Sequence, residues 1–375
     1  MSEGLNLKIA DFVFSILPAR TIKEFSPDKN YIPFITEGKA DIVLKVSKKK
    51  SPRNQGDEYS FITSPWRYYQ DQKRHIYNFF YSVKKGFSER VLILEPDFKK
   101  GEIILLPYLK GPVLRNPFSY PLDELIIINL LCRKYGLLVH SCGFVYKDKG
   151  YLFIGSSGAG KSTMARILER NRTFMSHRLT KNNKNLSPSP LIPSSFNSSP
   201  LVGEDKGGGF YYSPPIKGGE IFGLPSKVPS PLVGEGHGEG KLLDKNFSIL
   251  SDDRIAVRKR NERYFIYGTP WHGTEKFASP EMAPLTGLFF LKKDTNNSLH
   301  EISLTDTVSR LIKCSFPPFW DREGMASTLK ICEDIATSIP SFEFSFTPDD
   351  RAFDLIKKIL TAETLRHRDY KKLRS

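Results

Sequence analysis

A glycine-rich segment near the middle of the chain carries the residue types and the spacing that bind phosphate. It contains the full pattern G-x-x-x-x-G-K-[ST], with a strand-like run at 151–154 before it and a helix-like run at 164–168 after it. A strand, a glycine-rich loop and a helix in this order form a nucleotide-binding element. The predicted nucleotide-binding residues are Gly155, Ser156, Ser157, Gly158, Ala159, Gly160, Lys161, Ser162 and Thr163.

The residue types of this loop suggest separate tasks. Glycines let backbone N–H groups turn towards phosphate oxygens, and the start of a helix adds its positive dipole end to the same anions. We expect Lys161 to reach the outer phosphates, and the hydroxyl of Ser162 to bind a magnesium ion that bridges two of them. Thr163 is expected to support the start of the helix. The alternative is a glycine-rich turn beside a surface lysine, which the flanking runs disfavour.

The composition is that of a globular protein with room for two domains. The chain has 375 residues, of which 39% are hydrophobic and 12% aromatic. Its longest apolar run, 125–132, contains Asn129 and stops at Arg133, so we expect no membrane span. The N-terminus lacks the basic and apolar stretches of a secretion signal, which predicts a cytoplasmic protein. Four cysteines without C-x-x-C pairing predict reduced thiols rather than disulfides or a zinc site.

The formal net charge of +15 raises the question of a nucleic-acid or acidic peptide partner. Basic residues gather at 48–53, at 84–85 and in the tail 366–374. No recognition-helix or base-stacking pattern accompanies them, so we expect a solvated basic surface and do not expect nucleic acid as a partner.

The order of the predicted elements divides the chain into a β-rich domain at 1–118 and a mixed α/β domain at 119–375. Short runs of alternating apolar and polar residues, as at 12–16, 40–46 and 91–94, predict the first domain. In the second, helices are expected at about 121–134, 306–313, 325–335 and 349–360. Strands are expected at 137–146, 151–154, 247–251, 255–257, 264–267 and 288–291.

Residues 172–245 differ in character from the rest of the chain. They are rich in glycine and proline, and Ser-Pro-Leu-Val-Gly-Glu occurs twice, at 199–204 and 230–235. Such a segment cannot bury a core of its own, so we predict a disordered low-complexity insertion in the second domain. The alternative is a lid over the substrate, although lids are usually shorter and carry placed charges.

Two further elements could complete a phosphate-transfer site. Asp252 and Asp253 end an apolar strand, and in parallel α/β sheets such ends face the ligand crevice. One acid could hold a metal or its waters and the other could accept a proton, or both could be exposed acids of a turn. His140, in the strand before the loop, could contact phosphate or orient a carboxylate, or be a core histidine. His272 could line a pocket or belong to a turn.

Three segments together resemble a known family. Val139-His140, the loop from Gly155 to Ser162 and the segment Leu250 to Arg254 follow one another as in the catalytic domain of HPr kinase/phosphorylase, a P-loop fold similar to phosphoenolpyruvate carboxykinase. The resemblance spans about residues 120–270 without the insertion. It implies a P-loop mixed sheet with helices. It also implies active-site roles for His140 and Lys161, magnesium binding by Ser162, proton acceptance by Asp253, and a metal-side role for Asp252.

The sequence also departs from this family in two places. HPr kinases have an acid after the loop serine, where this chain has Thr163, and a glutamate-containing, arginine- and glycine-rich motif where this chain reads Tyr267 to Gly273. The β-rich first domain and the segment after Tyr267 are more similar to HPr-kinase-like proteins encoded beside peptide-modification enzymes. Some of those proteins phosphorylate a serine of a ribosomally made peptide. HPr itself is therefore not assigned as the acceptor.

The resemblance and the loop together predict an ATP- and Mg²⁺-dependent phosphotransferase that acts on a hydroxyl of a small protein or peptide. An ATP-binding sensor without transfer chemistry and a small-molecule kinase remain as alternatives, since fold analogy cannot choose among them. Transport ATPases and GTPase switches fit poorly, because neither a Ser-Gly-Gly-Gln nor an Asn-Lys-x-Asp motif is present. The family's hexamers leave a homo-oligomer open. The identity of the acceptor is also open.

Overall fold

Two mixed β-sheets and a few helices form the described part of this computed structural model, which confirms the mixed α/β class. The structure describes residues 4–20, 22, 26–50, 61–62, 66–82, 87–106, 116–173 and 247–361. These residues belong to one compact unit, formed by Met1–His177 with Asp244–Ser375. The second unit, Arg178–Leu243, lies outside the described residues, as does all of the predicted insertion 172–245 except its first two residues.

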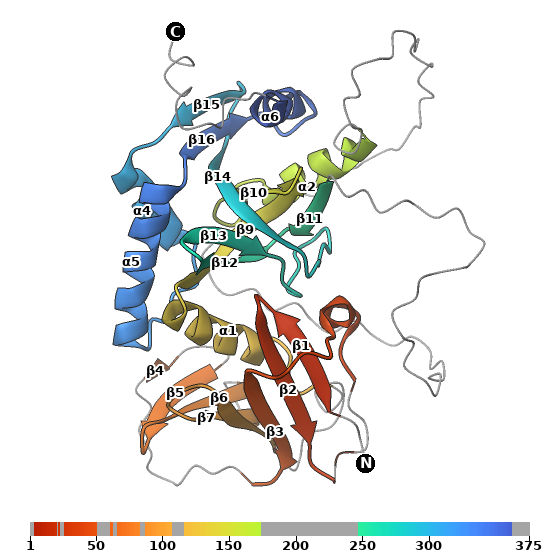
Figure 1. Cartoon of the computed structure of the whole chain (residues 1–375), viewed down its shortest axis with the longest axis vertical. Helices are drawn as coiled ribbons and strands as arrows, with labels where there is room; N and C mark the ends of the chain where they lie inside the picture. The colour runs from red at the N-terminus through yellow and green to blue at the C-terminus, as the bar shows by residue number, and fades with distance from the viewer. Residues whose placement is uncertain are drawn as a thin grey trace, which may run out of the picture. The chain divides into compact units, whose positions relative to one another are not determined.

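The first sheet has the strand order β1-β2-β3-β8-β7-β6-β5-β4 (Figure 1). Strands β2, β3 and β8 run parallel to one another, and the other pairs are antiparallel. The alternating runs noted in the sequence at 12–16 and 91–94 lie in β2 and β7, and the run at 40–46 overlaps β3, which begins at Ile42. The strands are β1 (Leu5–Ile9), β2 (Phe12–Pro18), β3 (Ile42–Lys48), β4 (Phe61–Ile62), β5 (Trp66–Asp71), β6 (Arg74–Ser82), β7 (Phe87–Leu94) and β8 (Lys100–Leu105), with the 3₁₀ helix η1 at Lys29–Phe34.

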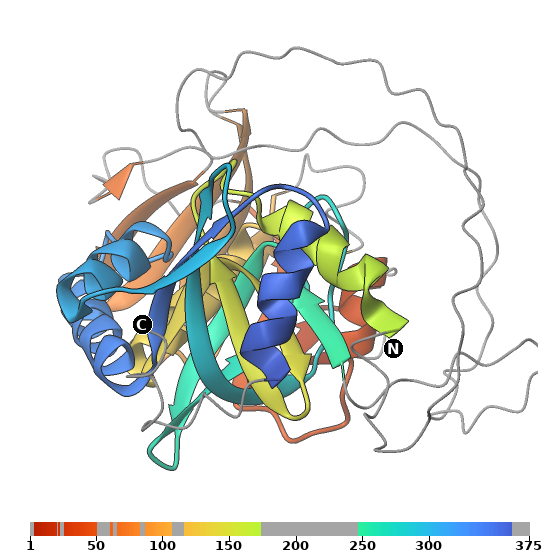
Figure 2. The ribbon, with the colours of Figure 1, turned by 90° about the horizontal axis from the view of Figure 1, so that it is seen from above.

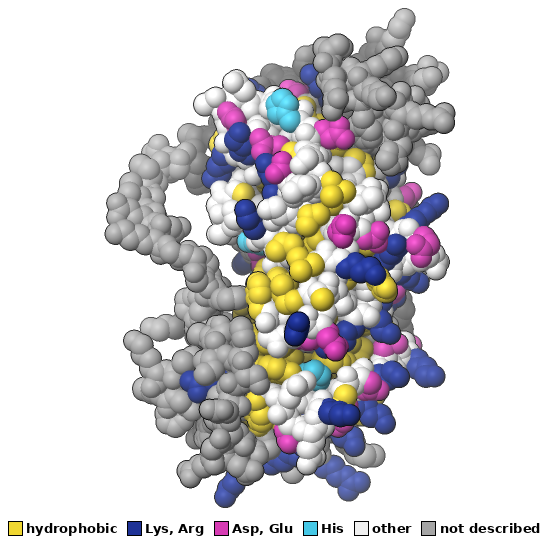
Figure 3. Space-filling view, turned by 90° about the vertical axis from the view of Figure 1, so that its left-hand side faces the viewer, with side chains coloured by type: hydrophobic (Ala, Val, Ile, Leu, Met, Phe, Trp, Pro, Cys, Tyr) yellow, Lys and Arg dark blue, Asp and Glu magenta, His cyan; other side chains and the backbone are white. Residues whose placement is uncertain are grey.

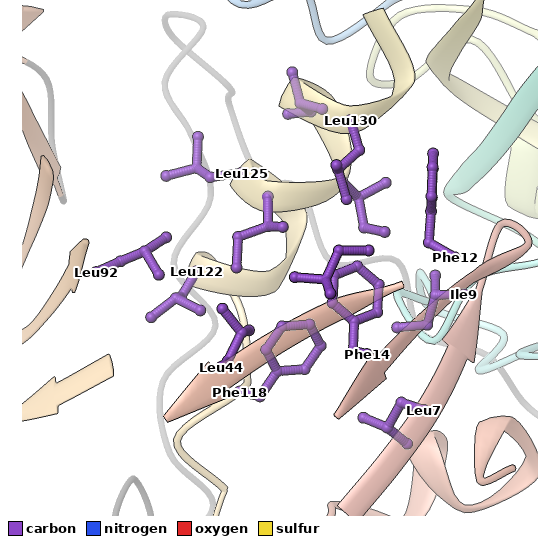
Figure 4. Packing of buried hydrophobic residues seen from close by; sticks show 14 of the residues in the cluster. Leu7, Ile9, Phe12, Phe14, Leu44, Leu92, Phe118, Leu122, Leu125 and Leu130 are labelled. Carbon is purple, nitrogen blue, oxygen red and sulfur yellow. The ribbon is translucent and has the colours of Figure 1, made fainter. Parts of the chain in front are cut away.

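Helix α1 (Leu122–Arg133) is buried on nearly every side, which accounts for its long apolar run. Pro121 is its N-cap residue, and the acids of its first turn suit the positive end of the helix dipole. Figure 4 shows Leu122, Leu125 and Leu130 of α1 close to side chains of the first sheet. The same core includes Leu138 and Ala256 of the second sheet. None of the helices in the described residues is long and apolar enough to cross a membrane.

The second sheet has the order β10-β9-β12-β13-β14-β16-β15, with β11 also paired to β9. Strand β14 pairs with β13 near its start and with β10 and β16 further on, so β10, β9, β12, β13 and β14 close into a ring. The strands expected at 255–257 and 264–267 are present and form a hairpin that turns at Asn261 and Glu262, both with positive φ. The strands are β9 (Gly136–Tyr146), β10 (Lys149–Ile154), β11 (Phe247–Ser251), β12 (Arg254–Arg260), β13 (Arg263–Tyr267), β14 (Met282–Lys293), β15 (Ser298–Glu301) and β16 (Ser341–Phe346).

Helices cover both faces of this second sheet (Figure 2). Helices α2 (Lys161–Arg170) and α6 (Arg351–Thr361) share one apolar core with β9, β10 and β16. Helices α4 (Leu304–Lys313) and α5 (Arg322–Ser338) belong to a second core on β12, β13 and β14. The helices expected from periodicity at 306–313, 325–335 and 349–360 are thereby confirmed, and they hold the sheet that carries the glycine-rich loop.

The face that carries α4 and α5 has a band of hydrophobic side chains with charged side chains around it (Figure 3). Exposed large hydrophobic residues of α4, of α5 and of the segment between them are Leu304, Phe319 and Leu329, of which Phe319 is 65% exposed. On this face Lys and Arg side chains lie among Asp and Glu side chains rather than in one basic patch. We assign no partner to this surface. The four cysteines are free thiols, as expected from their spacing.

A buried carboxylate ties the start of α1 to two other segments. Asp123 accepts hydrogen bonds from the Tyr31 hydroxyl at 2.5 Å and from Trp271 Nε1 at 2.8 Å. Its other oxygen accepts the Glu124 backbone N–H at 2.9 Å. Burial raises the pKa of Asp123 to about 6, although these hydrogen bonds favour its charged form. The network therefore connects η1, α1 and the segment after β13.

We expect the Tyr31→Phe variant to lose about 1–3 kcal/mol of stability at neutral pH, because Asp123 loses a donor in a buried site. The hydroxyl favours the ionised carboxylate, so the loss should be largest above about pH 6 and should shrink as pH falls below the folded pKa of Asp123. Urea unfolding at neutral pH and at pH below 5 measures this, with the exposed Tyr135→Phe as control. An equal loss at both pH values would contradict the assignment.

Candidate active site

The glycine-rich loop joins β10 to α2, as the sequence predicts. Strand β10 pairs in parallel with the central strand β14, so the loop leaves the sheet beside buried strands. Gly158 and Gly160 have φ values of +79° and +106°, in the left-handed region that glycine adopts without strain. A Cβ built at Gly158 meets no heavy atom within 4 Å, so the loop backbone is open at this point. An anion could therefore approach the backbone N–H groups closely.

Close packing fixes the two ends of the loop. A Cβ at Gly155 would lie 2.5 Å from Cβ of Ala159, and one at Gly160 would lie 2.5 Å from the ring of Phe346 on β16. Gly160 is also the N-cap residue of α2, whose first turn contains Lys161, Ser162 and Thr163. The loop and the helix start are thus held against the sheet, and they present the positive end of the helix dipole.

Lys161 lies under the loop with only 6% of its surface exposed. Its Nζ donates hydrogen bonds to the carbonyl oxygens of Gly155 at 2.8 Å and Ser156 at 3.0 Å. Burial lowers the pKa of Lys161, while the nearby charge of Asp253 acts in the opposite direction. The lysine is therefore placed inside the loop and interacts electrostatically with the second aspartate.

Asp253 and His140 form a close pair. In the antiparallel pairing of β9 with β12, His140 lies opposite Arg254, and the Ser141 N–H donates to the Asp253 carbonyl at 3.0 Å. His140 Nε2 consequently lies 3.0 Å from Asp253 Oδ1, with both side chains about a quarter exposed or less. Burial alone would raise the pKa of Asp253, but His140, Arg254 and Lys161 together lower it. Asp253 is therefore an ionised carboxylate that solvent can reach.

Asp252 points the other way and binds backbone. Its two oxygens accept the N–H groups of Gly273 and Glu275, each at 2.9 Å, and the residue is 1% exposed. Glu275 in turn pairs with Arg166 of α2 at 3.3 Å, so Asp252 holds a segment that contacts the helix after the loop.

The sequence predicts Asp252 and Asp253 at the end of a strand that faces the ligand crevice of a parallel sheet. In the structure, β11 and β12 are both antiparallel to β9, and Asp252 and Asp253 occupy the turn between them. His272 lies in the segment 268–275 and its Nδ1 is 3.0 Å from the Gly273 carbonyl, while Trp271 is buried against Asp123.

Two charged residues of the site, Arg254 and Glu124, are not predicted from the sequence. Arg254 pairs with Asp253 through NH1 and with Glu124 through Nε, and its guanidinium lies 5.0 Å from the centre of the Phe316 ring. Arg254 directly follows the two aspartates in the sequence, and this adjacency is the feature that could have marked it as part of the site. Glu124 is 130 residues away from Arg254 in the chain, and nothing in its local sequence marks it as a partner.

Magnesium would need few protein ligands at this site. Within the described ranges no three or more His, Cys, Asp and Glu side chains form a group that could hold a metal ion. A P-loop does not depend on such a group, because nucleotide oxygens and waters complete the coordination around one hydroxyl. Ser162, half-buried in the first turn of α2, offers that hydroxyl beside Lys161. The residues present therefore fit a nucleotide with its magnesium ion.

No family model matches the chain, and no curated protein matches it either.

Proposed function

We propose that the protein is an ATP-dependent phosphotransferase of the HPr-kinase-like type, with a P-loop kinase fold in its second sheet and helices. The observation that carries the proposal is the pairing of Asp253 with His140 at 3.0 Å, electrostatically coupled to Lys161 under a complete phosphate-binding loop. A loop alone would support nucleotide binding. An ionised, reachable carboxylate next to it supplies the base that transfer to a hydroxyl needs.

In the proposed reaction, the hydroxyl oxygen of the acceptor attacks the γ-phosphorus of ATP, the bond to the bridging oxygen breaks, and ADP leaves. Asp253 accepts the hydroxyl proton, and His140 orients the carboxylate through its hydrogen bond. Lys161 and the loop N–H groups stabilise charge on the transferred group. Ser162 would hold Mg²⁺, which supplies charge neutralisation when it is bound.

The acceptor in this proposal is a hydroxyl of a small protein or peptide, and the enzyme acts in the cytoplasm. The partial exposure of the Asp253 side chain, 21%, supports an acceptor that approaches from outside rather than one enclosed in a deep cavity. A serine hydroxyl is the simplest group that this base could activate. HPr is one candidate acceptor and a ribosomally made peptide is another.

Phosphate transfer from labelled Mg-ATP tests the proposal directly. The purified protein is offered HPr, a pool of serine-containing peptides and a metabolite extract together, and the products are separated by mass. Label on a peptide or protein serine is the expected result. Label on a metabolite would instead identify a small-molecule kinase. ATP binding without any labelled product would identify a sensor and overturn the proposal.

A further inference from the structure

Asp253 is held by a second charged residue besides His140. Its Oδ1 faces His140, and its Oδ2 pairs with NH1 of Arg254. Both carboxylate oxygens are thus fixed from different directions, which sets the plane of the group. A base held in one plane has its reactive geometry before the substrate binds. Such preorganisation lowers the activation barrier more than the same contacts do when the side chain is mobile.

Arg254 is itself fixed on several sides. Its Nε pairs with Glu124, and the two side chains are only 16% and 9% exposed. The guanidinium lies over the rings of Tyr120 and Phe316, 5.5 and 5.0 Å from their centres. Burial alone would lower the pKa of Arg254, but Glu124 and Asp253 raise it above its usual value. The side chain therefore has a permanent charge and little freedom to turn.

Glu124 is anchored to the scaffold rather than to the loop. It lies in the first turn of α1, where the helix dipole favours a carboxylate, and α1 is packed between the two sheets. Its neighbour Asp123 bonds Tyr31 and Trp271. Glu124 therefore fixes Arg254 relative to the buried helix α1, and Arg254 in turn fixes the carboxylate of Asp253, which faces the substrate.

We propose that Arg254, oriented by Glu124, is the positioning residue that holds Asp253 in the geometry for proton transfer. The inference rests on the proposed phosphotransferase function and adds a role that neither the P-loop nor the aspartate pair implies. Arg254 acts on the reaction through Asp253, because its NH1 is directed to Asp253, its Nε is directed to Glu124, and its guanidinium lies over two aromatic rings. It should influence turnover and leave nucleotide binding nearly unchanged.

The Arg254→Ala variant tests this role. We expect phosphate transfer at saturating Mg-ATP to fall about 10- to 100-fold, the effect of losing a charge-assisted hydrogen bond to the base. The dissociation constant for Mg-ATP should change less than about threefold, since Arg254 is not part of the loop. Guanidinium or ethylguanidinium ions, at concentrations far below those that unfold proteins, should fill the space that the side chain leaves beside Tyr120 and Phe316 and restore part of the rate.

Arg258→Ala is the matched control. Arg258 lies on the same strand, its guanidinium stacks on the Phe12 ring at 4.0 Å, and it bonds the Ala10 carbonyl rather than the site. Its variant should transfer phosphate at close to the wild-type rate and show no response to guanidinium. If guanidinium ions raise the rate of Arg254→Ala but not that of Arg258→Ala, the effect of Arg254 on the rate comes from positioning Asp253 and not from a general loss of stability.

If Arg254→Ala does not fold, the Glu124→Gln and Arg254→Lys variants replace it. Lysine keeps the charge without the planar fork, so Arg254→Lys should recover the fold but only part of the rate. Glu124→Gln should also reduce turnover without weakening Mg-ATP binding. Wild-type turnover in a folded Arg254 variant would overturn the inference and leave the phosphotransferase proposal intact. A wild-type protein that transfers no phosphate would instead refute the function itself.

Discussion

Replacing Asp253 with asparagine is expected to reduce phosphate transfer by about 10²- to 10⁴-fold, the usual contribution of a general base. Asparagine keeps the shape of the side chain, but its amide cannot accept the hydroxyl proton. Binding of Mg-ATP should be retained or become tighter, because a negative charge close to the phosphates is removed. Labelled-phosphate transfer at saturating Mg-ATP, measured beside a binding titration, separates the two effects.

Asp334→Asn provides a control of the same chemistry away from the site. Asp334 lies on α5 and, like Asp253, pairs with a cation, Lys259, and a second side chain, Tyr264. Its loss should lower stability slightly and leave transfer unchanged. Normal transfer by Asp253→Asn would remove the aspartate from the mechanism. Loss of ATP binding in the same variant would show that it serves the nucleotide instead.

The sequence predicted the parts of the site that depend on short stretches of chain. The loop needs only its own glycines, Lys161 and the flanking apolar runs, so the pattern alone placed it between β10 and α2. The helix at 122–133 was predicted for the same reason, since its start signals and its apolar run are adjacent in the chain.

Contacts between distant segments could not be derived in this way. His140 meets Asp253 because β12 pairs antiparallel with β9, and the register of that pairing is set by packing on both faces of the sheet. Strand β14 was predicted only at 288–291, although it runs from Met282 to Lys293, because Pro284 and Gly287 interrupt its strand-like pattern. Glu124 had no signal, since a buried acid on an apolar helix acquires a partner only through tertiary structure.

Replacing Lys161 with methionine is expected to weaken Mg-ATP binding about 10- to 100-fold, the effect of losing a charge-assisted hydrogen bond to phosphate. At saturating nucleotide, transfer should also fall by about 10²- to 10³-fold, because the charge that stabilises the transferred group is gone. The fold should survive. Methionine has a similar length. The variant loses two hydrogen bonds to loop carbonyls, but it no longer buries a charge, and the second effect offsets the first.

Lys149→Met is the matched control, because Lys149 is an exposed lysine at the start of β10, the strand that leads into the loop. Calorimetric titration with Mg-ATP and thermal unfolding without nucleotide would be measured for both variants. Tight binding by Lys161→Met would show that the buried lysine only closes the loop through Gly155 and Ser156. Weak binding with an unchanged unfolding temperature would assign its charge to the nucleotide, because a purely structural lysine would lower stability first.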